Sequence, residues 1–127
     1  MTNTNLFLRF EQICKIHRCS ITFTKEDGPY YLDGKRRIIF CPSHFPTQKW
    51  KIKVFCHELA HHFQNSLDTF KPNNQNLSEL LTYELDADRL AYFICLHYFS
   101  EFKIHHRTYI CYQNREEVDF LRRWYGL

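Results

Sequence analysis

The chain has 127 residues, a length typical of one domain, so we expect a single domain spanning residues 1–127. Hydrophobic residues make up 44% of it and aromatic residues 17%, which indicates a packed globule and excludes a disordered tail. A net charge of +3 with no concentrated basic patch predicts no direct nucleic-acid partner, and no apolar run approaches the roughly 20 residues that cross a bilayer.

The six cysteines are scattered along the chain, and no Cys-x-x-Cys pair is present to hold a structural zinc. The first residues lack the apolar core of a secretory signal. These observations favour reduced thiols over a disulfide framework. We therefore expect a soluble protein of the cytoplasm with no membrane partner.

The first part of the sequence predicts one helix followed by short strands. Apolar residues recur at offsets of three and four over residues 5–17, which is typical of an amphipathic helix. Alternation predicts a strand at residues 20–24, and residues 30–32 and 37–41 predict two more. Asp33-Gly34 between the last two predicts a tight turn with positive φ angles.

The rest of the sequence predicts two long helices. The apolar period changes to that of a helix over residues 47–66, and a second helix is expected over residues 79–99 with Ser78 as its N-cap. A polar run at residues 68–76 predicts the surface loop between them. Asn114 followed by Glu117 resembles a capping box and predicts a short terminal helix. The expected fold class is α+β, with a short antiparallel or mixed sheet packed on the first long helix.

The helix at residues 47–66 contains the motif His-Glu-x-x-His, formed by His57, Glu58 and His61. Residues four apart on a helix share a face, so both imidazoles can bind one ion while Glu58 lies beside it as a general base. Zinc suits such ligands, and a catalytic zinc site needs three protein ligands and a position open to water. The motif therefore predicts a zinc-dependent peptidase that needs one more ligand.

The third ligand is sought on the second long helix. Gln64 and Leu67 stand where a metzincin has glycine and histidine, which excludes that class. Glu84 and Asp88 are four residues apart and share a helix face. Asp86 is a rival ligand, but it points away from that face, so Glu84 is preferred.

Two segments carry a family resemblance. Residues 50–63 (WKIKVFCHELAHHF) and 83–91 (YELDADRLA) are similar to the zinc-helix and third-ligand segments of the ImmA/IrrE family, within the gluzincin class of zinc peptidases. The resemblance covers residues 31–96. It departs from the family at Leu90, where an aromatic residue is usual, and at residues 92–97, which lack the usual ending.

The resemblance implies a small zincin-like domain and a role for each residue. His57, His61 and Glu84 would be the zinc ligands, Glu58 the base, and Asp88 the acceptor of a hydrogen bond from the second nitrogen of a bound histidine. It implies an endopeptidase acting on a protein or peptide substrate, in regulated cleavage of a repressor or another regulatory protein. A regulatory partner protein is also implied, and it would have to supply any DNA contact.

Some assignments stay open. The candidate donors for the oxyanion, which are also candidate packing or surface residues, are His105, His106, Tyr109 and Tyr112. The strand at residues 37–41 either offers its edge to a substrate or is covered by a loop. Two other functions compete with the peptidase: a zinc-binding interaction module that does not cut, and a SprT-like protease. The latter would need a third histidine in place of Glu84.

Overall fold

The computed structural model describes residues 2–66 and 75–105, which together form an α+β fold. The elements within these residues, in chain order, are α1 (Asn3–Ile16), β1 (Ser20–Phe23), β2 (Tyr30–Leu32), β3 (Arg37–Phe40), α2 (Gln48–Ser66) and α3 (Leu77–Tyr98). Short 3-10 turns lie at Asp33–Lys35, Pro42–His44 and Ser100–Phe102. The predicted fold class and the order of these elements are confirmed. The predicted terminal helix and most of the predicted loop at residues 68–76 lie outside the described residues.

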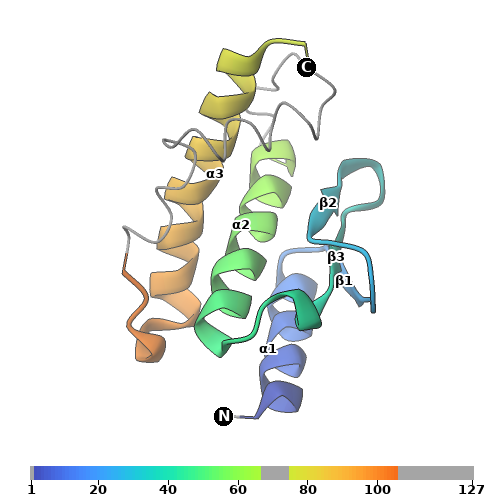
Figure 1. The fold of residues 1–127 in the computed structure, drawn as a ribbon, viewed down its shortest axis with the longest axis vertical. Coiled ribbons are helices and arrows are strands. Elements are labelled where there is room, and N and C mark those ends of the chain that lie inside the picture. The colour runs from blue at the N-terminus through green and yellow to red at the C-terminus, as the bar shows by residue number, and fades with distance from the viewer. Residues whose placement is uncertain (1, 67–74, 106–127) are drawn as a thin grey trace.

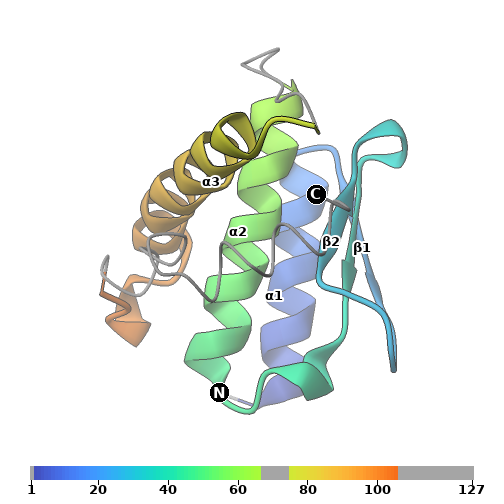
Figure 2. The same ribbon diagram turned by 45° about the horizontal axis from the view of Figure 1, so that its top comes forward.

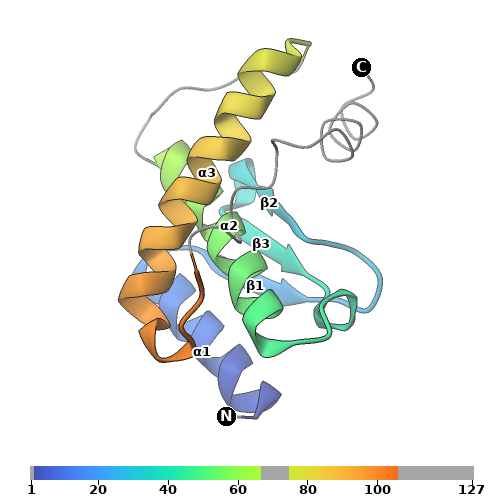
Figure 3. The same ribbon diagram turned by 60° about the vertical axis from the view of Figure 1, so that its left-hand side comes forward.

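The central element of the fold is α2. Figure 1 shows α2 between α3 on one side and α1 with the sheet on the other. The rotated view in Figure 2 keeps this order, and in Figure 3 α3 crosses in front of α2. Contacts join α2 to α3, α1, β2 and β3. One helix therefore faces two neighbours at once, α3 through one side and the rest of the fold through the opposite side.

The helix α1 begins at a side-chain cap and ends in a left-handed residue. The Thr2 hydroxyl accepts a hydrogen bond from the Asn5 backbone N–H (3.2 Å), which satisfies one of the unpaired amides of the first turn. Arg18 has a φ of 59°, so the chain reverses there toward β1. The predicted apolar stripe is confirmed, and its buried members are Leu6, Phe10, Ile13 and Cys14.

The sheet is mixed and has the strand order β1-β3-β2. The central strand β3 runs parallel to β1, with Ile21 opposite Ile38, and antiparallel to β2, with Tyr31 opposite Ile38. Both edges of β3 are therefore paired. The hypothesis that residues 37–41 offer a free edge to a substrate is wrong, because hydrogen bonds to β1 and β2 already use that strand.

The connection between β2 and β3 differs from the predicted tight turn. Leu32 pairs with Arg37, so four residues separate the strands rather than two. Loops of this length are built around a turn of ordinary negative φ angles and place any positive φ near the end. Accordingly, Asp33–Lys35 forms a 3-10 turn and Arg36 has a φ of 48°, while Gly34 does not have a positive φ.

The hydrophobic core lies where α1, α2 and β3 meet. Phe10 of α1 stacks on Phe55 of α2, with ring centroids 4.1 Å apart and planes 8° apart. The rings of Phe40 and Phe99 make edge-to-face contacts with the Phe10 ring, with centroid distances of 5.7 and 5.8 Å. All four side chains are fully buried. Offset-stacked and edge-to-face contacts of this kind add to the free energy of burial, so they hold α2 firmly against the sheet and α1.

The helix α3 starts earlier than the sequence predicted. The Asn76 side chain, not Ser78, caps it by accepting a hydrogen bond from the Glu79 backbone N–H (3.2 Å). Both residue types are good caps, and capping by Asn76 starts the helix two residues earlier, at Leu77 instead of Glu79. In the described part of the chain, no helix combines the length and the apolar character that a membrane span requires.

Candidate metal centre

The motif on α2 places three ionisable side chains beside α3. His57 and His61 are one helical turn apart, so their imidazoles project from the same side of the helix. The side chains of His57 and His61 are 15% and 9% exposed, and Glu58 is also buried. One atom from each of these three residues lies within 4.8 Å of the others, close enough for the group to hold a metal ion.

The helix α3 adds a carboxylate to the two imidazoles. Glu84 Oε2 lies 2.8 Å from His57 Nε2 and 3.0 Å from His61 Nε2, and the two Nε2 atoms are 3.1 Å apart. A tetrahedral zinc ion with bonds of about 2.0–2.1 Å separates its ligand atoms by roughly 3.3 Å. The triangle formed by these three atoms is therefore of the size that such an ion requires, with slight expansion.

Asp88 lies one turn after Glu84 and contacts the other side of the His57 ring. Its Oδ1 atom is 2.6 Å from His57 Nδ1, and the residue is only 1% exposed. A buried carboxylate needs a hydrogen-bonded partner, and the His57 Nδ1–H donates to it. This contact fixes the tautomer that leaves the Nε2 lone pair directed toward Glu84.

Three lone pairs consequently meet at one point. The hydrogen bond to Asp88 leaves a lone pair on His57 Nε2. Likewise, Gln64 Oε1 lies 2.8 Å from His61 Nδ1 and accepts a hydrogen bond from the Nδ1–H, which leaves a lone pair on His61 Nε2. The third lone pair belongs to Glu84 Oε2. Electron pairs at this spacing repel unless a cation lies between them. A proton or a metal ion resolves the repulsion.

The pKa values of the metal-free site follow from the same contacts. Burial opposes the charged form of His57, but hydrogen bonds with Asp88 and Glu84 overcome it and raise the pKa of His57 well above 6.5. Burial likewise opposes ionisation of Glu84, yet attraction to His61 and a hydrogen bond from His57 hold the pKa of Glu84 well below 4.5. Without a metal, a proton on His57 therefore supplies the cation.

Glu58 differs from the other carboxylates of the centre. It is 5% exposed, yet among the described residues its carboxylate makes no hydrogen bond or ion pair. Burial raises the pKa of Glu58 above 4.5; the carboxylates of Glu84 and Asp88 add to the rise, and the two histidines oppose it. A buried carboxylate without a fixed partner lowers the stability of the folded protein. Buried ionisable groups with shifted pKa values are typical of catalytic sites.

A second group of contacts surrounds His61, and the sequence analysis did not anticipate it. Gln64 Nε2 donates to the Tyr83 carbonyl (3.0 Å), and the Tyr83 ring stacks on the His61 ring at 4.8 Å. Asn65 Nδ2 donates to the His61 carbonyl (2.8 Å) and approaches the Tyr83 hydroxyl (3.3 Å). Gln64 follows His61 by three residues and so shares its helix face, which was the available signal.

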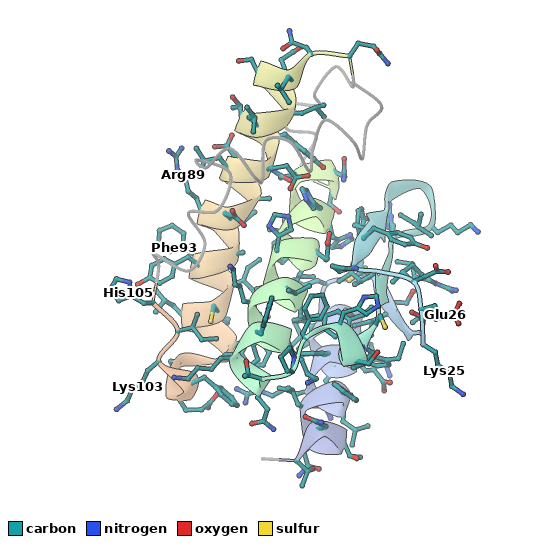
Figure 4. All side chains as sticks on the ribbon, in the orientation of Figure 1. Lys25, Glu26, Arg89, Phe93, Lys103 and His105 are labelled. Carbon is teal, nitrogen blue, oxygen red and sulfur yellow. The ribbon has the colours of Figure 1, made fainter. Side chains whose placement is uncertain are left out.

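Other candidate residues lie apart from the centre. His105 is exposed, and Figure 4 shows its side chain on the outer side of α3, pointing away from α2. The remaining candidate oxyanion donors, His106, Tyr109 and Tyr112, lie outside the described residues. Asp86 is half exposed and pairs with Arg89, as expected for a residue that faces away from His57 and His61.

Cys56 and His62, which lie next to His57 and His61 on α2, are both buried in the interior of the fold. His62 is buried, its Nε2–H donates to the His17 carbonyl (2.7 Å), and its Nδ1 accepts from the Tyr31 hydroxyl (2.8 Å). It therefore ties α2 to α1 and β2, on a different side of the helix from His61. Cys56 is fully buried within the hydrophobic core, where its small side chain packs as an apolar residue.

Comparisons with protein-family models, with curated proteins and with solved structures found no match for this chain. Any assignment of function therefore depends on the arrangement of the side chains described above.

Proposed function

We propose that this protein is a zinc-dependent endopeptidase in which His57, His61 and Glu84 hold the metal, Glu58 is the general base, and Asp88 orients His57. The observation that carries the proposal is the convergence of two Nε2 atoms and one carboxylate oxygen, each within 3.1 Å of the others, from two different helices. Two nitrogen ligands and one oxygen ligand form the donor set of many catalytic zinc sites.

Glu58 distinguishes a catalytic zinc site from one that only binds the metal. When bound, zinc lowers the pKa of its water and polarises a substrate carbonyl. Glu58 would take the proton of that water and return it to the departing amine. Its raised pKa suits this task, because a base that accepts and then donates a proton works best when its pKa lies near the working pH.

The carboxylate ligand bears on the class of peptidase. A SprT-like protease would use a third histidine, whereas the side chain that approaches His57 and His61 here is Glu84. This supports a zincin-like domain of the gluzincin class, similar to the ImmA/IrrE family. By the same resemblance, the substrate would be a repressor or another regulatory protein, and a regulatory partner would act with it. The described cysteines form no disulfide bond, which supports a cytoplasmic location.

A zinc-binding interaction module is the competing function. A structural zinc site usually closes its fourth position with another protein ligand, and it has no use for a base. Glu58 lies beside the centre, buried and without a fixed partner among the described residues, at a cost that a purely structural site would not need. This supports catalysis over binding alone.

The metal site is tested by the zinc content of the purified protein. We expect one zinc per chain, lost in Glu84→Ala and kept in Asp86→Ala, a matched control on the same helix whose side chain is half exposed. Zinc retained by Glu84→Ala would contradict the ligand set.

Catalysis is tested by a peptide library whose new amino termini are identified by mass spectrometry. We expect the zinc-loaded protein to cut it and Glu58→Gln to keep its zinc but lose the cleavage. Cleavage that persists in Glu58→Gln would exclude Glu58 as the base, and absence of cleavage by the zinc-loaded wild type would favour the interaction module.

A further inference from the structure

We infer that Gln64 is a positioning residue that fixes the tautomer and ring orientation of His61 and couples that ligand to the backbone of α3. The inference rests on the proposed metal site and adds to it a residue that the metal-binding motif does not contain. Gln64 is 8% exposed, and its amide lies between the His61 ring and the Tyr83 carbonyl.

The backbone of α3 decides which way the amide of Gln64 points. A carbonyl oxygen only accepts, so the group facing the Tyr83 carbonyl must be the Gln64 NH₂, at 3.0 Å. The amide oxygen is then directed at His61 Nδ1, at 2.8 Å. Because that oxygen also only accepts, the His61 Nδ1 must carry a proton. The Nε2 lone pair is thereby left for a metal ion.

The same contact couples the two helices that supply the ligands. Tyr83 directly precedes Glu84 in α3, so a hydrogen bond to its carbonyl holds Gln64 at the turn that carries the third ligand. The Tyr83 ring also covers His61, with the two planes 25° apart. The position of His61 therefore depends on α3 through both a hydrogen bond and a stacked ring.

The two histidines have outer partners of different charge. His57 donates to the Asp88 carboxylate, whereas His61 donates to a neutral amide. Three buried carboxylates, Glu58, Glu84 and Asp88, already lie in or beside the centre. A neutral partner orients His61 without adding a fourth negative charge, which would raise the pKa of the base further.

The test compares zinc affinity in three proteins by competition with a chromophoric chelator. Gln64→Met keeps the length of the side chain but removes both hydrogen bonds, and we expect zinc binding about 10–100-fold weaker than in the wild type, the usual effect of losing such a partner. Gln48→Met makes the same chemical change near the start of α2, and we expect wild-type affinity. Thermal unfolding in chelator checks that Gln64→Met is folded.

A second measurement needs no variant. Long-range ¹⁵N–¹H spectra of the zinc-loaded wild type report which ring nitrogen of His61 carries a proton, and we expect Nδ1–H with Nε2 bound to the metal. Unchanged zinc affinity in Gln64→Met, or an unprotonated Nδ1 in His61, would overturn the inference while leaving the proposed function intact. A wild type that binds no zinc would instead overturn both.

Discussion

His57 and Asp88 are 31 positions apart in the chain, yet His57 Nδ1 and Asp88 Oδ1 lie 2.6 Å from one another across the α2–α3 interface. The contact uses the imidazole nitrogen that faces away from Glu84, so it sets the direction of the other nitrogen. A residue outside the proposed ligand set would thus govern how well the proposed site holds its metal.

Replacing Asp88 should weaken the centre without removing a ligand. In Asp88→Asn the charge that favours the proton on His57 Nδ1 is lost, and we expect zinc affinity to fall about 10–100-fold. Competition with a chelator measures the change, and Asp86→Asn is the matched control on the exposed side of α3. Equal affinities in the two variants would show that Asp88 has no such role.

Zinc affinity should rise with pH. The pKa of His57 is raised well above 6.5 in the metal-free protein, so His57 carries a proton at neutral pH that zinc must displace. While the pH stays below that raised pKa, each unit of pH should strengthen binding about tenfold per displaced proton. Titrations at pH 6, 7 and 8 test this. An affinity independent of pH would mean that His57 is already neutral or is not a ligand.

Chelation of zinc should lower the melting temperature. An ion that binds only the folded state at about 1,000 times its dissociation constant adds roughly 4 kcal/mol to the free energy of unfolding. For a protein of this size the melting temperature should then differ by on the order of 10 °C between zinc and chelator. Glu84→Ala should show little difference between the two conditions. A wild type with the same melting temperature in both would contradict a bound metal.

Stability should also depend on the aromatic core behind α2. Phe10 is fully buried against Phe55, and truncating it to alanine should cost about 3–5 kcal/mol in the free energy of unfolding. Urea denaturation measures the loss. The control is Leu8→Ala on the same helix, which is half exposed and should change the free energy of unfolding far less.

The parts of the fold and site that could be predicted from the sequence are those set by helical periodicity. The four-residue spacings of His57 with His61 and of Glu84 with Asp88 each fix one face of a helix, and the two faces meet as expected. The order of the sheet could not be read this way. β1 pairs with β3, which is not the next strand in the chain. The alternation of a short strand predicts which side chains are buried but not which strand it pairs with.

The role of Gln64 and the position of His105 could not be predicted from the sequence, for different reasons. Gln64 is uncharged and belongs to no metal-binding motif. Its orientation depends on a hydrogen bond to the Tyr83 carbonyl, which belongs to another helix. Sequence order makes His105 a candidate, because it follows the helix that carries Glu84. Beyond α3 the chain passes to the outer side of that helix, which sequence order alone does not reveal (Figure 4).

The neighbouring histidines His61 and His62 project from different sides of α2, one toward α3 and the other toward α1 and β2. Any tilt or rotation of α2 must therefore move both His61 and His62. A substitution at Tyr31, which hydrogen-bonds to His62, should change the affinity of the proposed zinc site. The position of β2 and the geometry of the proposed metal site are therefore linked through α2.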